Sequence, residues 1–191
     1  PLRRGRQTAN GVFGNAASVL VGDFLYSRAF QMMVDVGQMR VMEVLADATN
    51  VIAEGEVLQL MNIHDADLAV AEYLRVIRFK TAKLFEASAR LGAVLAGVDL
   101  DIEECCADYG RSLGTAFQLV DDLLDYEGDP HALGKNVGDD LREGKPTLPL
   151  IYAMAHSSIE DTARMRVAVE NGGLEELESI TRAIESAGGL E

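Results

Sequence analysis

Apolar side chains recur at every third or fourth position along most of the chain, which is the spacing of an amphipathic α-helix. No stretch of alternating apolar and polar residues is long enough to compete as a β-strand. The spacing predicts long helices, followed by shorter ones, over about residues 12–36, 38–62, 65–96, 102–127, 149–156, 160–171 and 174–187. We therefore expect an all-α fold, in which residues 1–191 form one domain, a bundle of long antiparallel helices.

Breaks in the apolar pattern indicate where these helices begin and end, and their apolar content indicates where they lie in the bundle. Asp65 is a candidate N-cap for the third helix, and Gly97 with the acidic residues after it ends that helix. Residues 127–150 combine Gly, Pro and charged residues without sustained periodicity, which predicts a loop. The first helix, 12–36, is long and apolar, and two of the helices are apolar nearly all round. We expect those two helices to lie at the centre of the bundle.

Three carboxylates lie close together near the C-terminal end of the helix over 102–127. Asp121 and Asp125 are one turn apart and Asp122 and Asp125 are three residues apart, so all three share one face. A helix C-terminus disfavours negative charge, and the surrounding apolar residues turn this face inward or toward a cleft. A bound Mg²⁺ would relieve the repulsion, since Mg²⁺ takes one or two carboxylates together with water and phosphate oxygens. The alternative is an exposed acidic helix end.

The loop after these carboxylates carries Lys135 and Lys145 among glycines and acids. It is not a P-loop, because Pro146 stands where Ser or Thr is required. The carboxylates do not form an EF-hand either, because Pro130 stands where Gly is required. A Gly-rich loop with two lysines beside a metal site is suited to hold a diphosphate, although a solvated surface loop is the alternative. Lys80 lies mid-helix on an apolar face, where a lysine usually snorkels to solvent.

Charge and cysteine content exclude several classes of protein. The net charge of −14 argues against a nucleic acid or an anionic membrane surface as partner, since both require a basic surface. Cys105 and Cys106 are adjacent and cannot cross-link the fold, which indicates a reducing, cytoplasmic compartment. No apolar run is long enough for a transmembrane segment, and no signal-peptide pattern is present. The start at Pro1 and the ending "SAGGLE" indicate a piece of a longer protein.

Several motifs together resemble the trans-prenyl diphosphate synthase family over essentially the whole chain. They are "RRGRQTANGVFGNAASVLVGDFLYSRAFQ", "GEVLQL", "GTAFQLVDDLLDYEGD" and "LGKNVGDDLREGKPTLPLIYA". The resemblance implies Mg²⁺-dependent, head-to-tail condensation of isopentenyl diphosphate with an allylic diphosphate, farnesyl or longer. The implied product is a long-chain, octaprenyl diphosphate for quinone side chains. The implied fold is an isoprenoid-synthase bundle of helices around a central apolar cavity. The resemblance also implies a homodimer and a loose membrane association for product release.

The resemblance also implies roles for individual residues. The residues that match the family's second aspartate-rich motif, which binds Mg²⁺, are Asp121, Asp122 and Asp125. The catalytic residues, which match positions that contact the allylic diphosphate, are Lys80, Thr81, Gln118 and Lys135, with Lys145 as a nearby substrate-binding residue. Arg3 matches an arginine that binds the allylic diphosphate, and Arg4 matches one that binds isopentenyl diphosphate. The implied base is a diphosphate oxygen, so no role is assigned to His64, His131 or His156.

The chain departs from the family pattern at both ends. The first aspartate-rich motif, which in the family precedes "LRRG", and the helices expected after Glu191 are not in the chain. We therefore expect an incomplete domain that is inactive alone. A set of small residues, methionines and one leucine could line or floor a product tunnel, or could simply form part of the core. These residues are Ala16, Ala17, Gly22, Met32, Met33, Leu58 and Met61.

Other functions compete with a prenyl synthase. A non-catalytic partner subunit of a heteromeric synthase typically has degraded aspartate motifs, whereas the aspartates and lysines are intact here. A terpene cyclase of the same fold usually carries a second motif of the NSE type. A plain acidic interaction module would not bind farnesyl diphosphate in a Mg²⁺-dependent way.

Overall fold

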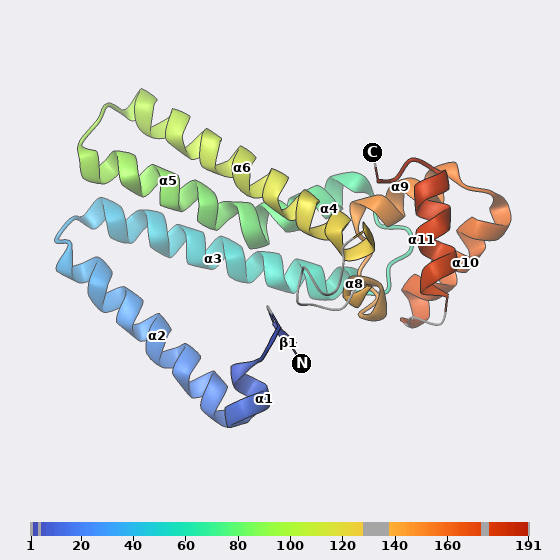
Figure 1. Cartoon of the computed structure of the whole chain (residues 1–191). Helices are drawn as coiled ribbons and strands as arrows, with labels where there is room; N and C mark the ends of the chain where they lie inside the picture. The colour runs from blue at the N-terminus through green and yellow to red at the C-terminus, as the bar shows by residue number, and fades with distance from the viewer. Residues whose placement is uncertain (1, 4, 128–137, 173–175, 191) are drawn as a thin grey trace.

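Nearly all of the described chain is helical, so the all-α prediction is confirmed (Figure 1). The computed structural model describes residues 2–3, 5–127, 138–172 and 176–190. Its short strands, β1 (Leu2–Arg3) and β2 (Arg6–Gln7), pair antiparallel. Its helices are α1 (Ala9–Phe13), α2 (Asn15–Asp35), α3 (Met39–Asn62), α4 (Val70–Ile77), the π-helical turn η1 (Arg78–Ala82), α5 (Lys83–Ala96), α6 (Leu100–Glu127), α8 (Asp139–Arg142), α9 (Leu148–His156), α10 (Ile159–Asn171) and α11 (Leu177–Ser186).

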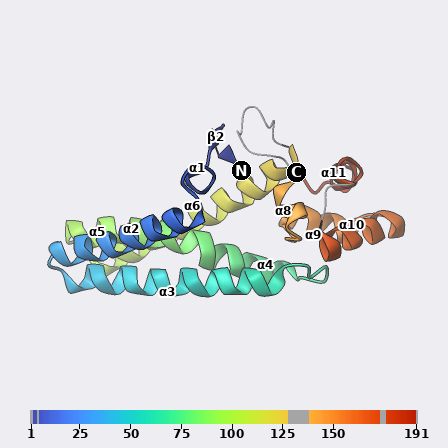
Figure 2. The ribbon, with the colours of Figure 1, turned by 90° about the horizontal axis from the view of Figure 1, so that it is seen from below.

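The helices α3, α5 and α6 run antiparallel to their neighbours and form the long part of the bundle (Figures 1 and 2). Helix α5 packs along both α3 and α6. Val44 and Ala48 of α3 are buried against Ala87 of α5. Helix α5 ends at Gly97, as predicted, because a glycine in the left-handed conformation (φ 67°) ends the helix and turns the chain toward α6.

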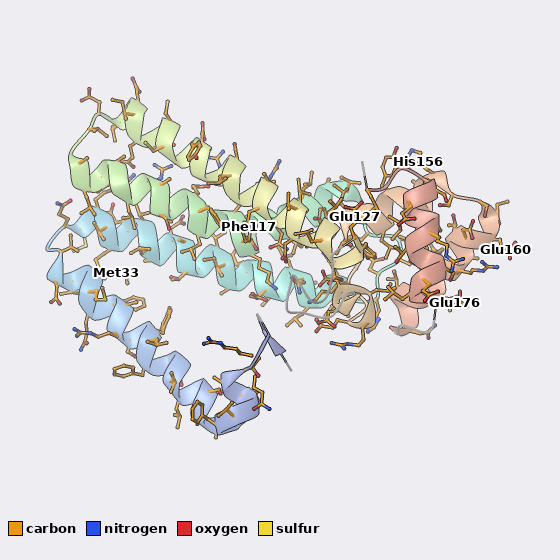
Figure 3. All side chains as sticks on the ribbon, viewed as in Figure 1. Met33, Phe117, Glu127, His156, Glu160 and Glu176 are labelled. Carbon is orange, nitrogen blue, oxygen red and sulfur yellow. The ribbon has the colours of Figure 1, made fainter. Side chains whose placement is uncertain are left out.

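The short helices α8 to α11 lie together at the opposite end of the bundle from the α2–α3 turn (Figure 2). One buried apolar cluster joins them to the end of α6 and includes Tyr126 of α6, Leu141 of α8, Leu150 of α9 and Met165 of α10. This cluster anchors the C-terminal end of α6, where the three predicted carboxylates lie. Figure 3 places Glu127, the last residue of α6, at this junction.

Helix α2 lies at the outside of the described bundle, although its residues are strongly apolar. Figure 1 shows α2 diverging from α3 toward the outside of the bundle. Met33 is the buried residue of α2, whereas Leu20 is 67% exposed and Phe24 is 66% exposed. An apolar helix needs a partner surface to bury both sides. Within the described residues, no other helix covers the outer side of α2, so its apolar side chains remain exposed.

The third predicted helix differs from the structure at its start and in its middle. Helix α4 begins at Val70 with Ala69 as N-cap, not at Asp65. The Asp65 carboxylate instead accepts a hydrogen bond from the backbone N–H of Asp67 (2.9 Å), a local turn that competes with helix formation. The helical run then passes through the π turn η1 before it continues as α5. That turn is the segment that carries Lys80 and Thr81.

The loop predicted over 127–150 is helical in part. Helix α8 forms within it, and Leu141 of that helix is fully buried, so packing stabilises a turn that has no apolar periodicity in the sequence. Helix α9 follows at Leu148. Residues 128–137, which include Lys135 and His131, lie outside the described residues. No helix in the described ranges combines the length and the apolar character that crossing a membrane requires.

Candidate diphosphate and metal site

A cavity of about 540 Å³ opens beside the C-terminal half of α6. Helices α3, α4 and α6, the π turn η1 and residues 140–147 all contribute to its wall. Its lining residues are Gln59, Asn62, Ile63, Leu68, Tyr73, Val76, Ile77, Lys80, Thr81, Phe117, Gln118, Asp121, Asp122, Asp140, Lys145, Pro146 and Thr147. Most of the described residues predicted from the sequence to bind substrate or metal therefore meet at one cavity. Its wall combines carboxylates, two lysines and apolar side chains.

The π turn η1 presents Lys80 and Thr81 to this cavity. Such turns within α-helices occur frequently at functional sites. The Lys80 ammonium donates a hydrogen bond to Oε1 of Gln59 (2.9 Å) and forms an ion pair with Glu56 (3.3 Å). The hydroxyl of Thr81 donates to Oε1 of Gln118 (2.9 Å). Lys80 thus has partners from α3 at the cavity wall. A lysine that only extended its ammonium group to solvent would not need such partners.

A chain of hydrogen bonds continues from Gln118 to the carboxylate of Asp122. Nε2 of Gln118 donates to one oxygen of Asp122 (2.7 Å), and the hydroxyl of Tyr73 donates to the other (2.6 Å). Asp122 is 4% exposed. Burial, with the negative charges of Asp140 and Asp121, raises the pKa of Asp122 to about 6, while its two hydrogen bonds act in the opposite direction. Burial also raises the pKa of Tyr73, so this phenol stays neutral and donates a hydrogen bond to Asp122.

The predicted aspartates do not all face the cavity. Asp121 and Asp122 line it, together with Asp140, which the sequence analysis did not select. Asp125 is 1% exposed and is not among the lining residues; its carboxylate accepts a hydrogen bond from the backbone N–H of Asp140 (3.1 Å). Asp125 therefore lies on the side of α6 that packs against α8, where it ties the two helices together. Its assignment as a metal ligand remains a prediction.

Lys145 provides a second ammonium group at the cavity. Its Nζ lies 2.5 Å from a carboxylate oxygen of Glu143 and 3.4 Å from one of Asp140. Burial alone would lower the pKa of Lys145, but these two carboxylates raise it above the ordinary value, so the side chain stays charged. The positions of the remaining predicted residues are not described: Lys135 and Arg4 lie outside the described residues, and only the backbone of Arg3, in β1, is described.

The cavity's donor set fits Mg²⁺, the cation that the family resemblance implies. Asp121, Asp122 and Asp140 supply hard carboxylate oxygens, which Mg²⁺ prefers. Among the described residues, no three acidic, His or Cys side chains gather closely enough to hold a metal ion by themselves. Mg²⁺ binds through one or two protein carboxylates and completes its shell with water and phosphate oxygens.

Tyr73, Gln59 and Asp140 are cavity residues that the sequence analysis missed. Tyr73 and Asp122 are separated by 49 positions, so local periodicity presents Tyr73 as an ordinary core residue of its helix. Gln59 lies within "GEVLQL", a motif that supports the family resemblance but has no chemical signal of its own. For Asp140 the available signal was its place between two lysines in the Gly-rich loop.

Comparison with known proteins identifies the family of this chain. A model of the polyprenyl synthetase family matches residues 1–186. The chain is 58% identical over its full length to octaprenyl diphosphate synthase of Escherichia coli (strain K12), of which it covers 59%. It is 44% identical to a nonaprenyl diphosphate synthase of Rhodobacter capsulatus, of which it covers 58%. The chain thus spans less than two thirds of the length of these relatives.

A solved structure of a polyprenyl synthase from Caulobacter crescentus CB15, complexed with calcium and isoprenyl diphosphate, superimposes with a TM-score of 0.94. The two proteins are 49% identical, and the match covers 99% of this chain and 58% of that one. A decaprenyl diphosphate synthase structure from Rhodobacter capsulatus gives a TM-score of 0.88 at 47% identity, with 98% of this chain and 58% of that one covered. The chain belongs to the polyprenyl synthetase family.

Proposed function

We propose that this chain carries the allylic-diphosphate site of a trans-polyprenyl diphosphate synthase. The enzyme would condense isopentenyl diphosphate head to tail with an allylic diphosphate, farnesyl or longer, into a long-chain, octaprenyl diphosphate for quinone side chains. The observation that carries the proposal is the single cavity that joins Lys80, Thr81 and Gln118 to Asp121 and Asp122. It offers cationic and neutral donors beside carboxylates that can share a cation with a diphosphate.

The donors at this cavity can bind the diphosphate and stabilise it as it leaves. Lys80 and Lys145 supply positive charge, and the hydroxyl of Thr81 and the amide of Gln118 supply neutral donors. Gln59 holds Lys80 and Gln118 holds Thr81 before the reaction, so the positive charge of Lys80 is already in place as negative charge develops on the leaving group. Mg²⁺, held by Asp121 and Asp122 in this proposal, would neutralise further charge on the same group.

The apolar part of the wall would protect the allylic cation from water. Leu68, Val76 and Ile77 are buried beside the cavity, and Phe117 lines it from α6. Exclusion of water prevents hydrolysis of a reactive intermediate. The proton lost in the condensation would go to an oxygen of the departing diphosphate, so the site needs no separate side-chain base.

The product tunnel remains a prediction in this proposal. Met33 is buried near the α2–α3 turn, at the opposite end of the bundle from Glu127 (Figure 3). A chain that grew from the cavity toward Met33 would follow the long axis of α3. Met32 and Met61 are 60% and 73% exposed, so in the described residues they border no closed tunnel.

The exposed apolar surface of α2 supports a homodimer. Val19, Leu20, Val21, Phe24 and Leu25 are each more than half exposed along this helix. A second copy of the protein could bury this apolar surface. Analytical ultracentrifugation tests this directly: a dimer is expected, and Leu20→Glu with Phe24→Glu should shift it to monomer.

We further place the protein in the cytoplasm, with loose membrane association for product release. Both cysteines are free thiols, Cys105 exposed and Cys106 partly buried, which suits a reducing compartment. Cell fractionation followed by a salt wash of the membranes would distinguish loose association from none. Recovery of the protein only from an oxidising compartment would contradict the placement.

The decisive experiment is incorporation of radiolabelled isopentenyl diphosphate by the full-length protein that the gene encodes, with farnesyl diphosphate and Mg²⁺. A ladder of products that ends at octaprenyl length is expected. Asp121→Ala should lower the rate by orders of magnitude, whereas Asp108→Asn, on the exposed side of α6, should not. No incorporation by the folded protein would refute the catalytic proposal and favour a non-catalytic partner subunit, whose α2 surface would bind a second, different chain.

A further inference from the structure

The π turn that carries Lys80 and Thr81 is approached by two helices, each through a glycine. On α3 the residue is Gly55, and on α6 it is Gly114; both are buried. Neither glycine is needed for an unusual backbone angle, since both lie within regular helix. Glycine in the interior of a helix is unfavourable, so each position calls for another explanation.

The space around Gly55 supplies that explanation. A Cβ at this position would lie 2.5 Å from the backbone N of Lys80, and 2.9 Å from both Cα of Lys80 and the carbonyl carbon of Phe79. All three neighbours are backbone atoms, so no side-chain rotation can relieve the overlap. Helix α3 therefore touches the π turn itself, at the residue that presents its ammonium group to the cavity.

Gly114 makes the matching contact from α6. A Cβ there would lie 2.7 Å from Cα of Ala82, the last residue of the π turn, and 2.9 Å from Cβ and Cγ of Phe85. By contrast, a Cβ at Gly92 in α5, another glycine within a helix, would meet nothing within 4 Å. Gly110 of α6 also packs closely, since a Cβ there would lie 2.4 Å from the carbonyl oxygen of Phe85, but its neighbours belong to α5. Gly55 and Gly114 differ from it because their closest neighbours are backbone atoms of the π turn.

One helical turn after each glycine stands a glutamine that holds a side chain of the π turn. "GEVLQ" (55–59) on α3 and "GTAFQ" (114–118) on α6 share the pattern Gly-x-x-x-Gln. Gln59 accepts from the Lys80 ammonium, and Gln118 accepts from the Thr81 hydroxyl, each at 2.9 Å. The glycine and the glutamine lie on one face of each helix, four residues apart.

We propose that these two Gly-x-x-x-Gln segments form a clamp that sets the position of Lys80 and Thr81 at the cavity. Gly55, Gly114 and Gln59 are then positioning residues, which act through the groups that bind the diphosphate. The inference rests on the proposed function, because it assigns diphosphate binding to Lys80 and Thr81. The clamp itself is defined by contacts that do not depend on that assignment.

The test compares Gly55→Ala with Gly92→Ala in the full-length protein. Calorimetry with inorganic diphosphate and Mg²⁺ measures binding, and the incorporation assay measures KM and kcat. Displacement of Lys80 by a fraction of an ångström to one ångström should weaken diphosphate binding and kcat/KM by about 10- to 100-fold. Gly92→Ala should leave both within about 2-fold, because the new methyl group enters open space.

A double-mutant cycle separates positioning from a general loss of structure. In a Lys80→Ala background, Gly55→Ala should cost at most about 2-fold further in binding, because the group it displaces has been removed. The same factor in both backgrounds would show a merely structural role and overturn the proposal. Gln59→Leu, which adds no crowding, covers the case in which Gly55→Ala fails to fold; it should weaken binding in the Lys80 protein and leave the Lys80→Ala protein unchanged.

Hydrogen exchange distinguishes failure of the clamp from failure of the proposed function. Gly55→Ala should speed exchange of the amides of 78–82 relative to the Gly92→Ala protein. If the unmodified protein binds no diphosphate but this exchange still rises, the proposed function is wrong and the clamp stands. If Gly55→Ala changes neither binding nor exchange, the clamp is wrong and the proposed function is unaffected.

Discussion

Replacing Asp122 with Asn tests whether the charged carboxylate of Asp122 at the cavity lowers the stability of the fold. Asp122 is buried, and its pKa rises from 3.8 to about 6 in the folded protein, chiefly because burial penalises the charged form. The folded state therefore binds this proton more tightly than the unfolded state. The resulting stabilisation is complete below pH 3.8 and is lost as the pH rises through about 6.

The expected magnitude follows from the separation of the two pKa values. A shift of about 2 units corresponds to about 3 kcal/mol in the free energy of unfolding, as an upper value, because 1 unit is about 1.4 kcal/mol. Asn at this position is neutral throughout and has no such dependence on pH. The free energy of unfolding of the variant, relative to that of the unmodified protein, should therefore rise by up to about 3 kcal/mol as the pH increases from 4 to 7. The variant should also lose activity.

Urea unfolding of both proteins in EDTA buffers from pH 4 to pH 7.5 measures this difference. EDTA removes divalent cations, which would otherwise stabilise the charged carboxylate. Asp108→Asn on the exposed side of α6 is the matched control and should show no comparable trend. A difference between the Asp122→Asn variant and the unmodified protein that stays constant within about 0.5 kcal/mol across this range would refute the reasoning.

Three further predictions concern other described contacts. Gly144→Ala should lower the free energy of unfolding by about 1–3 kcal/mol, because Gly144 has φ 69° and a Cβ would lie 2.2 Å from Nδ1 of His64. In thermal unfolding, Gly188→Ala, with φ 77° and open space, should cost less; an equal cost would rule out the contact with His64 as the cause. Glu103→Gln should lower the melting temperature at pH 7, because this buried carboxylate pairs with arginines of α3 and α5 that hold its pKa below the usual value. That stabilisation is present above pH 4.5 and is lost as the pH falls through the folded pKa, so a difference that persists in acid would contradict it. Lys80→Met should raise the KM for the allylic diphosphate by about 10-fold or more, and an unchanged KM in steady-state kinetics would exclude Lys80 from the site.

The helices could be predicted because their apolar spacing is local information. The end of α5 at Gly97 agrees with the prediction, since it depends on residues within a turn of the boundary. The start of α4 could not be predicted in the same way. An N-cap at Asp65 and a turn closed by the same carboxylate use the same side-chain oxygen, and the choice depends on the packing of the residues that follow.

The candidate site was predictable in its residue types and only partly in its geometry. The spacing of the aspartates places all three on one face of α6, but it does not say which part of that face α8 will cover. In the structure α8 covers Asp125, while Asp121 and Asp122 stay at the cavity. The exposure of α2 could not be predicted for a similar reason, because apolar content predicts that a surface will be covered but not which chain will cover it.

The π turn η1 has a consequence for the rotational phase of the helices on either side of it. Each residue of an α-helix turns the side-chain direction by about 100°, so the one extra residue in a π turn offsets the faces of α4 and α5 by about that angle. Tyr73 of α4 can therefore point to Asp122 while Ala87 of α5 packs on α3. Deleting one residue from 78–82 would restore an uninterrupted helix, but only one of these two faces could keep its neighbour. Homologous chains should therefore keep the length of this segment unchanged.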